Sequence, residues 1–133
     1  MLIDSGDRAF SVTNLKQVAA AVVTVLQHPQ ETANQYLYVD SFAVTQKEIL
    51  AVLQKEIARK WDVKEMSTVE AVKEGKAMLG RGDAGAMGLL LTASFVGEGF
   101  GNDFTSDAEL ANGMLGLPRE ELGESVRSLV AGR

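Results

Sequence analysis

Hydrophobic and polar residues form their clearest pattern in residues 34–67, where they predict a strand, a helix and a second strand. Residues 36–39 are a short aromatic and β-branched run, which is typical of a strand. Residues 61–66 alternate apolar and polar side chains, as a half-buried strand does. A strand–helix–strand segment of this length predicts a β-α-β unit with a right-handed parallel crossover.

The helix inside this unit has a defined start and one apolar face. Thr45 followed by Glu48 is a capping box, in which each residue bonds a free backbone amide of the other. Ile49, Leu53 and Ile57 then recur at helical spacing. The connection in residues 40–44 contains no glycine, so it does not predict a phosphate-binding turn.

The N-terminal segment predicts polar, flexible residues 1–9, a short strand at residues 10–13 and a helix over Leu15–Gln27 with Asn14 as its N-cap. The helix is expected to end at His28, because a residue before proline avoids the helical region. It is apolar on nearly every face, and such a helix has to be covered on more than one side.

The C-terminal half predicts four further helices. A second capping box, Ser67 with Glu70, opens a helix to about residue 79, and a glycine-rich turn leads into an apolar helix over residues 86–96. Ser106 with Glu109 predicts a third capping box, for a short helix ending near residue 115, and Pro118 suits the first position of the last helix.

These elements predict the α/β class: a helix-rich fold with a small two- to three-stranded, mostly parallel sheet. We find no internal repeat, low-complexity tract or linker, so residues 1–133 are expected to form a single substrate-binding-type domain.

Composition and charge narrow the function classes. The net charge of −5 and the scattered basic residues argue against a nucleic-acid partner. The absence of cysteine excludes a disulfide framework and a thiolate zinc site. No signal-peptide core follows Met1, and the longest apolar-rich stretch is too short for a membrane span. We therefore expect a soluble, cytoplasmic protein without a membrane partner.

Residues 97–104 are the best local candidate for a binding wall. Alternating glycines allow close approach of backbone and ligand, and neighbouring aromatic rings supply flat contact area. The predicted substrate-binding residues are Phe95, Gly97, Gly99, Phe100 and Phe104. The alternative interpretation is a mobile connection whose phenylalanines belong to the core.

Other motifs carry less chemistry. Residues 80–85 match the dinucleotide fingerprint G-x-G-x-x-G, but they follow a predicted helix instead of a strand, and Asp83 would place a negative charge in the phosphate site. The weak candidates for acid–base catalysis are Asp103, Glu98, Tyr38 and His28. No constellation of metal ligands is recognised, and we expect no metal.

Several segments together resemble NmrA-like and isoflavone-reductase-like proteins. They are Phe10-Ser-Val-Thr, residues 28–39 and Thr45-Gln-Lys-Glu; Gly97-Glu-Gly-Phe-Gly-Asn-Asp-Phe and Leu115-Gly-Leu-Pro-Arg-Glu-Glu extend the resemblance to the fungal branch. The resemblance covers nearly the whole chain but only the C-terminal half of the family's usual protein. This family commonly has an acidic residue just before position 18, where the present chain has Gln17.

The resemblance implies an atypical short-chain dehydrogenase architecture, with an NAD(P)-binding Rossmann part followed by a substrate-binding part. The glycine fingerprint and the catalytic lysine belong to the first part, so no residue of this sequence inherits them. The sequence is expected to be a truncated substrate-binding module that needs no cofactor, does not bind NAD(P) alone and takes a small, largely apolar, aromatic or polyketide-like ligand.

Two alternatives to this module stay open: a cofactor-free isomerase or cyclase of fungal secondary metabolism, and a regulatory subunit that pairs with a full-length homologue. If the module itself is part of an enzyme, that enzyme is an NAD(P)H-dependent oxidoreductase whose cofactor domain the chain lacks. In the complete architecture Leu15–Gln27 would pack against the Rossmann sheet. On its own the apolar face of this helix is expected to mediate homo-oligomerisation or docking on a partner protein.

Overall fold

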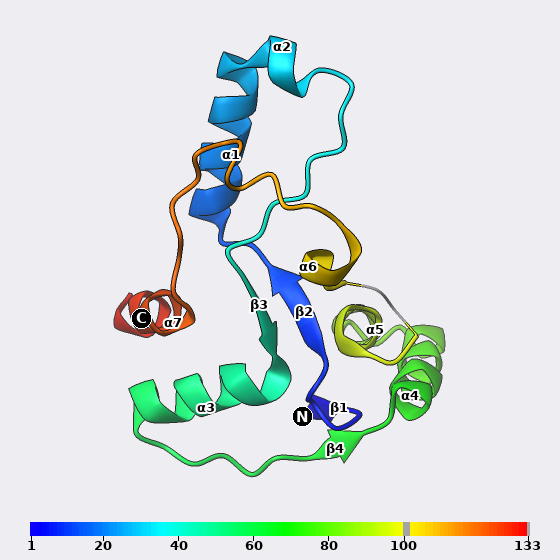
Figure 1. Cartoon of the computed structure of the whole chain (residues 1–133). Coiled ribbons are helices and arrows are strands. Elements are labelled where there is room, and N and C mark those ends of the chain that lie inside the picture. The colour runs from blue at the N-terminus through cyan, green and yellow to red at the C-terminus, as the bar shows by residue number, and fades with distance from the viewer. Residues whose placement is uncertain (100–101, 133) are drawn as a thin grey trace.

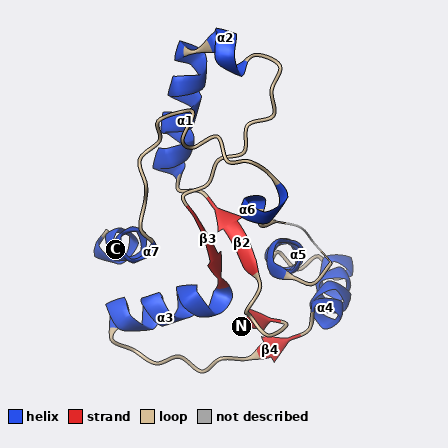
Figure 2. Cartoon of the chain, viewed as in Figure 1, coloured by secondary structure: helices blue, strands red, loops and turns tan. Residues whose placement is uncertain are grey.

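The computed structural model describes residues 1–99 and 102–132. Within them the chain forms seven helices and four short strands (Figures 1 and 2). In chain order the elements are β1 (Leu2–Ile3), β2 (Ala9–Val12), α1 (Leu15–Gln27), α2 (Pro29–Thr32), β3 (Phe42–Thr45), α3 (Gln46–Ile57), β4 (Glu65–Met66), α4 (Thr68–Gly80), α5 (Gly85–Val96), α6 (Phe104–Asp107) and α7 (Leu122–Ala131).

The strands pair as two separate two-stranded sheets. β1 pairs with β4 in parallel, and β2 pairs with β3 antiparallel over four residues on each strand. Helices α4 and α5 pack beside one end of the strands, α3 and α7 lie together on the other side, and α1 with α2 extends away from the sheets (Figure 1). The predicted class, a helix-rich α/β fold with a small sheet, is confirmed.

The predicted β-α-β unit is wrong in its pairing. Residues 36–39 are not a strand: Tyr38 makes an isolated parallel bridge to Leu110, and Tyr36 is 94% exposed. The strand lies further along, at Phe42–Thr45, in the segment expected to be a connection. It pairs with β2, whereas β4 pairs with β1, so β3-α3-β4 crosses between two sheets. Which segment becomes a strand depends on where its backbone finds hydrogen-bond partners elsewhere in the chain, and this outweighs the local strand propensity.

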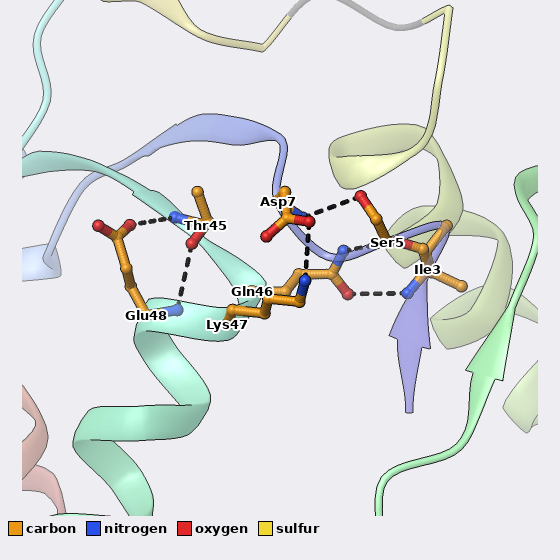
Figure 3. A network of polar contacts seen from close by, with 7 residues as sticks. All are labelled: Ile3, Ser5, Asp7, Thr45, Gln46, Lys47 and Glu48. Atoms are coloured by element: carbon orange, nitrogen blue, oxygen red, sulfur yellow. Dashed lines mark hydrogen bonds and ion pairs between the residues drawn. The ribbon is translucent and has the colours of Figure 1, made fainter.

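The first residues were predicted to be polar and flexible, and this is also wrong. Leu2 and Ile3 form β1 and are buried. The Gln46 side chain completes the strand on its other edge: Ile3 N donates to Gln46 Oε1 and Gln46 Nε2 donates to Ile3 O, each at 3.0 Å (Figure 3). One amide side chain therefore acts as a substitute strand for β1, and it ties the N-terminus to the start of α3.

Of the predicted strand at residues 61–66, only Glu65–Met66 forms one. Trp61 and Val63 are each 39% exposed.

The helix starts that depend on neighbouring residues were predicted correctly in three cases. α1 has the predicted bounds, although the Asn14 side chain makes no capping bond and instead donates to Glu120 and Ser125. The capping boxes Thr45–Glu48 and Ser67–Glu70 are both present. The hydroxyl of each N-cap accepts the amide of its glutamate, at 3.1 Å in α3 (Figure 3) and 3.2 Å in α4. Such caps are worth about 1 kcal/mol each.

The predicted ends of the C-terminal helices need correction. α6 is capped by Asp103 instead of Ser106, and residues 111–116 form turns. The last helix begins at Leu122, not at Pro118. Pro118 instead offers its carbonyl oxygen to Gln17 Nε2 at 3.0 Å, so residues 118–121 lie against α1 before the chain turns into α7.

The core has two clusters. The first joins β1, β2, β3, α4 and α5 through Ile3, Phe10, Val44, Ala71, Ala93 and Val96. α4 and α5 approach closely at Gly75, because this residue has no Cβ. A Cβ there would come within 2.7 Å of the Leu90 side chain. The second joins α1 to the turns near residue 111 through Ala21, Ala111 and Leu115.

α1 buries one face and exposes the other. Gln17 and Ala21 point into the structure, whereas the large apolar residues on the other side remain exposed: Leu15, Val18, Val22, Val23 and Leu26. α1 was predicted to be packed against other elements on more than one side. Within the described residues, other elements pack on one side of it only.

The buried Gln17 amide makes a specific prediction. The residue is 1% exposed and donates to Pro118 O. Gln17→Glu replaces this donor with a buried carboxylate that faces a carbonyl oxygen, so the free energy of unfolding at neutral pH should fall by about 1–3 kcal/mol. Urea unfolding measures it.

Gln30→Glu is the matched control, because Gln30 is exposed in α2. Its free energy of unfolding should stay within about 0.5 kcal/mol of the parent. If Gln17→Glu were as stable as this control, the hydrogen bond to Pro118 would not hold residues 118–121 in place.

Candidate functional site

The candidate site is centred on the buried Asp40, in the loop before β3. Asp40 is 5% exposed, and one of its carboxylate oxygens accepts a hydrogen bond from Ser11 Oγ at 3.3 Å. Its backbone is held by the Asn112 side chain: Asp40 N donates to Asn112 Oδ1 at 3.2 Å, and Asn112 Nδ2 donates to Asp40 O at 2.6 Å. The Asn112 side chain therefore fixes the backbone of Asp40, and the Ser11 hydroxyl bonds its carboxylate.

Burial raises the pKa of the Asp40 carboxyl above its ordinary value of 3.8. The hydrogen bond from Ser11 opposes this effect, and the negative charge of Asp103 adds to it. A buried carboxyl with few donors holds its proton to a higher pH than an exposed one. Asp40 is thus suited to accept a hydrogen bond from a ligand or to exchange a proton with it.

Three residues predicted from the sequence lie around Ser11, next to Asp40. Phe104 N donates to Ser11 Oγ at 3.1 Å, and the Phe104 ring lies against the Tyr38 ring with centroids 5.3 Å apart and planes tilted by 57°. Asp103 caps α6 by accepting the Thr105 amide at 3.1 Å. The structure therefore brings Tyr38, Asp103 and Phe104 together, with two aromatic rings beside an acidic centre.

A cleft of about 510 Å³ opens beside Asp40. Its volume lies within the range of small-molecule sites. Its walls come from the start of β3, α6, the turns after it and the segment before α7. The lining residues are Asp40, Ser41, Phe42, Ala43, Thr105, Leu110, Asn112, Gly113, Leu117, Pro118, Arg119, Glu120, Glu121 and Leu122.

None of the predicted site residues that the structure describes lines this cleft: Tyr38, Asp103 and Phe104 lie near Ser11, and the others lie elsewhere. Gly97 is buried against Ala93 and Thr68, where a Cβ would clash with both. Glu98 N donates to Asp4 Oδ2 at 3.0 Å and to Thr68 Oγ1 at 3.1 Å, so this part of the predicted wall joins α5 to β1 and α4.

Phe95 is exposed on α5, and Gly99 has a positive φ of 86°, a conformation that favours glycine. His28 lies at the end of α1, where its Nδ1 is 3.0 Å from Thr24 O. Phe100 lies outside the described residues.

The glycine fingerprint at residues 80–85 has no phosphate-binding geometry. It follows helix α4, and Asp83 Oδ1 accepts the Gly85 amide at 2.8 Å at the start of α5. The carboxylate already occupies an amide that a phosphate would use.

Ser11, Asp40 and Asn112 were missed by sequence reasoning. Asp40 follows the apolar run at residues 36–39, and a charged residue directly after a predicted strand is a usable signal for a site. Asn112 carries no such signal, because it meets Asp40 from 72 positions away in the chain.

The described residues were also compared with the requirements of a metal site and of a membrane-spanning helix. Among residues 1–99 and 102–132, no group of three or more histidine, aspartate or glutamate side chains could hold a metal ion. In the same part of the chain, no helix combines the length and the apolar character needed to cross a membrane.

Comparison with known proteins relates the chain to fungal oxidoreductases. It is 30% identical over 132 residues to a protein named Oxidoreductase poxI from Penicillium oxalicum, covering 98% of this chain and 42% of that protein. It is 26% identical over 131 residues to Oxidoreductase aprR from Aspergillus flavus, covering 98% of this chain and 44% of that one. The chain thus spans less than half the length of these curated relatives. No family model and no solved structure matches it.

The raised pKa of Asp40 predicts how stability depends on pH. The native state keeps this proton over a pH range in which the unfolded chain has lost it, so the group destabilises the fold as pH rises from just below 3.8 through the folded pKa. The free energy of unfolding of Asp40→Asn, relative to the parent, should therefore rise between about pH 3 and about pH 7. Urea unfolding over this range measures it.

Asp7→Asn is the control with the opposite sign. The hydrogen bond from Lys47, 2.7 Å away, lowers the pKa of Asp7, so the parent gains stability from this group as pH rises. The two variants should diverge in opposite directions from the parent. Parallel pH dependence of the two would contradict the buried environment of Asp40.

Proposed function

We propose that this chain is the ligand-binding portion of an oxidoreductase-related protein and holds a small, largely apolar ligand in the cleft at Asp40. The observation that carries the proposal is a buried carboxylate with one hydroxyl partner in a cleft of about 510 Å³. The names of the fungal relatives support the oxidoreductase connection. The resemblance to NmrA-like proteins, an expectation from sequence, points to the same substrate-side role.

The walls of the cleft define the ligand's chemistry. Phe42, Leu110, Leu117 and Leu122 supply apolar surface. Polar and charged residues also line the cleft: Thr105, Arg119, Glu120 and Glu121. Asn112 bonds the Asp40 backbone, and the Ser41 hydroxyl donates to Glu120. The buried Asp40 carboxylate, with one hydroxyl partner, offers an acceptor for a donor on the ligand. An apolar ring system with a single hydroxyl or amine group fits this arrangement.

We propose further that the chain does not bind NAD(P) by itself. Dinucleotide phosphates bind where a strand runs through a glycine turn into a helix whose first amides are free. Here the starts of α3 and α4 carry the carboxylates of Glu48 and Glu70 in capping boxes. Hydrogen bonds from Ser67 lower the pKa of Glu70, so this helix start carries a negative charge at neutral pH. A pyrophosphate would be repelled there.

Calorimetric titration tests both parts of this function. 4-Phenylphenol, an apolar biaryl with one hydroxyl, should bind the parent chain, and Asp40→Asn should weaken binding by about tenfold because the charged acceptor is lost. NADPH should give no binding heat at micromolar concentration. Asp7→Asn removes an exposed carboxylate and should bind 4-phenylphenol like the parent.

Either of two results would refute the proposal. Micromolar NADPH binding by the purified chain would refute the proposal that the chain does not bind NAD(P) by itself. Equal binding of 4-phenylphenol by the parent and Asp40→Asn would remove Asp40 from the ligand site.

We also propose that the exposed face of α1 pairs with a second copy of the chain. Leu15, Val18 and Val22 are spaced by three and four positions and continue to Leu26, which forms one apolar stripe along the helix. The stripe lies opposite the buried Gln17 and Ala21. Two such helices bury their stripes against each other in an isologous contact, which makes the stripe self-complementary.

Sedimentation velocity tests this pairing. The purified chain should shift from monomer to dimer as its concentration rises, and Val22→Lys should keep it monomeric because a charge would be buried in the contact. Val69→Lys, on the exposed side of α4, should dimerise like the parent. A parent chain that stays monomeric at high concentration would contradict the proposal.

A further inference from the structure

A second cleft, separate from the one at Asp40, lies between α3, the N-terminus and the segment that follows α3. Its volume is about 230 Å³. Figure 1 shows the chain running from α3 to β4 as a long loop. Trp61, Asp62 and Val63 of this loop supply one wall of the cleft. The lining residues are Met1, Leu2, Gln46, Ile49, Leu50, Leu53, Trp61, Asp62 and Val63.

The cleft is built from apolar side chains that the fold leaves partly exposed. Ile49, Leu50 and Leu53 lie on one face of α3, as the helical spacing requires. Trp61 and Val63 lie opposite in the loop, and each keeps 39% of its surface exposed. Apolar surface that stays open to water on both walls of a cleft favours an apolar occupant.

The polar groups of the cleft restrict the charge of that occupant. Both polar atoms of the Gln46 amide are engaged by the backbone of Ile3 at 3.0 Å. Of the described residues that line the cleft, only Asp62 has a charged side chain, and Met1 also carries the α-ammonium group of the chain. An ionised ligand of either sign would lose hydration in these apolar surroundings, which is unfavourable.

We propose that this cleft binds a small, flat, uncharged aromatic molecule of one or two rings. An apolar cavity of about 150 Å³ is enough to hold benzene, and 230 Å³ is below the range of sites for drug-sized ligands. The size therefore selects a mono- or bicyclic ring, and the Trp61 indole offers it an aromatic face or edge. This site is independent of the function proposed for Asp40.

Trp61 reports directly on occupation, because it is the single tryptophan of the chain. Its indole N–H gives one separate signal in a ¹⁵N-correlated NMR spectrum of the labelled full chain. Titration with 2-naphthol, which is uncharged at neutral pH, should move this signal in a saturable way. The anion 2-naphthoate, with the same rings, should bind at least about tenfold more weakly.

Two variants with the same substitution separate the cleft from the rest of the surface. Val63→Asp adds a charge to the cleft wall at a half-exposed loop residue, so it should weaken 2-naphthol binding about tenfold without unfolding the chain. Val69→Asp, at an exposed position in the first turn of α4, should bind like the parent. Both retain the Trp61 signal.

The outcomes are distinct. A Trp61 signal that does not respond to 2-naphthol would overturn the proposal, as would equal affinity for 2-naphthoate or equal effects of the two valine variants. Asp40→Asn should leave the Trp61 response unchanged. Failure of this site therefore says nothing against the cleft at Asp40, and failure at Asp40 says nothing against this one.

Discussion

The backbone of residues 38–40 lies outside both sheets, and the way its polar groups are satisfied shapes much of the molecule. Buried backbone amides and carbonyls need partners. Ala111 N donates to Tyr38 O at 2.7 Å, and the Asn112 side chain bonds both the amide and the carbonyl of Asp40. These bonds fasten the turns after α6 to the loop before β3. The Asp40 cleft and the second core cluster at Ala111 and Leu115 both depend on that attachment.

The elements that could be predicted from sequence are those whose cause is local. The end of α1 follows from Pro29, and the starts of α3 and α4 follow from capping boxes that span four residues. The strands could not be predicted in the same way. Residues 36–39 have a strand composition, yet β2 pairs with Phe42–Thr45. Strand pairing depends on which two segments the fold brings side by side. The residue pattern within a single segment does not show this.

The candidate site was predictable in part for the same reason. Tyr38, Asp103 and Phe104 were recognisable as chemistry-bearing residues in loops, but only the fold shows that they meet around Ser11. Gly97 and Glu98 looked equally suitable, and they instead join α5 to Asp4 and Thr68. A glycine-rich loop offers close approach to any neighbour, whether ligand or helix. The sequence does not show which neighbour it will be.

The charges at the helix starts determine whether the phosphates of a dinucleotide could bind there. Among the described residues, the starts of α3, α4, α5 and α6 each have a carboxylate that accepts a backbone amide, from Glu48, Glu70, Asp83 and Asp103. These carboxylates stabilise the helices and oppose any phosphate there. Under the proposed function, a dinucleotide would therefore have to bind outside the region matched by this chain. The matched region would supply clefts and an apolar helix face, surfaces suited to a ligand and to another polypeptide. Under the same proposal, the exposed apolar surface of the chain is where a ligand or a second polypeptide would bind.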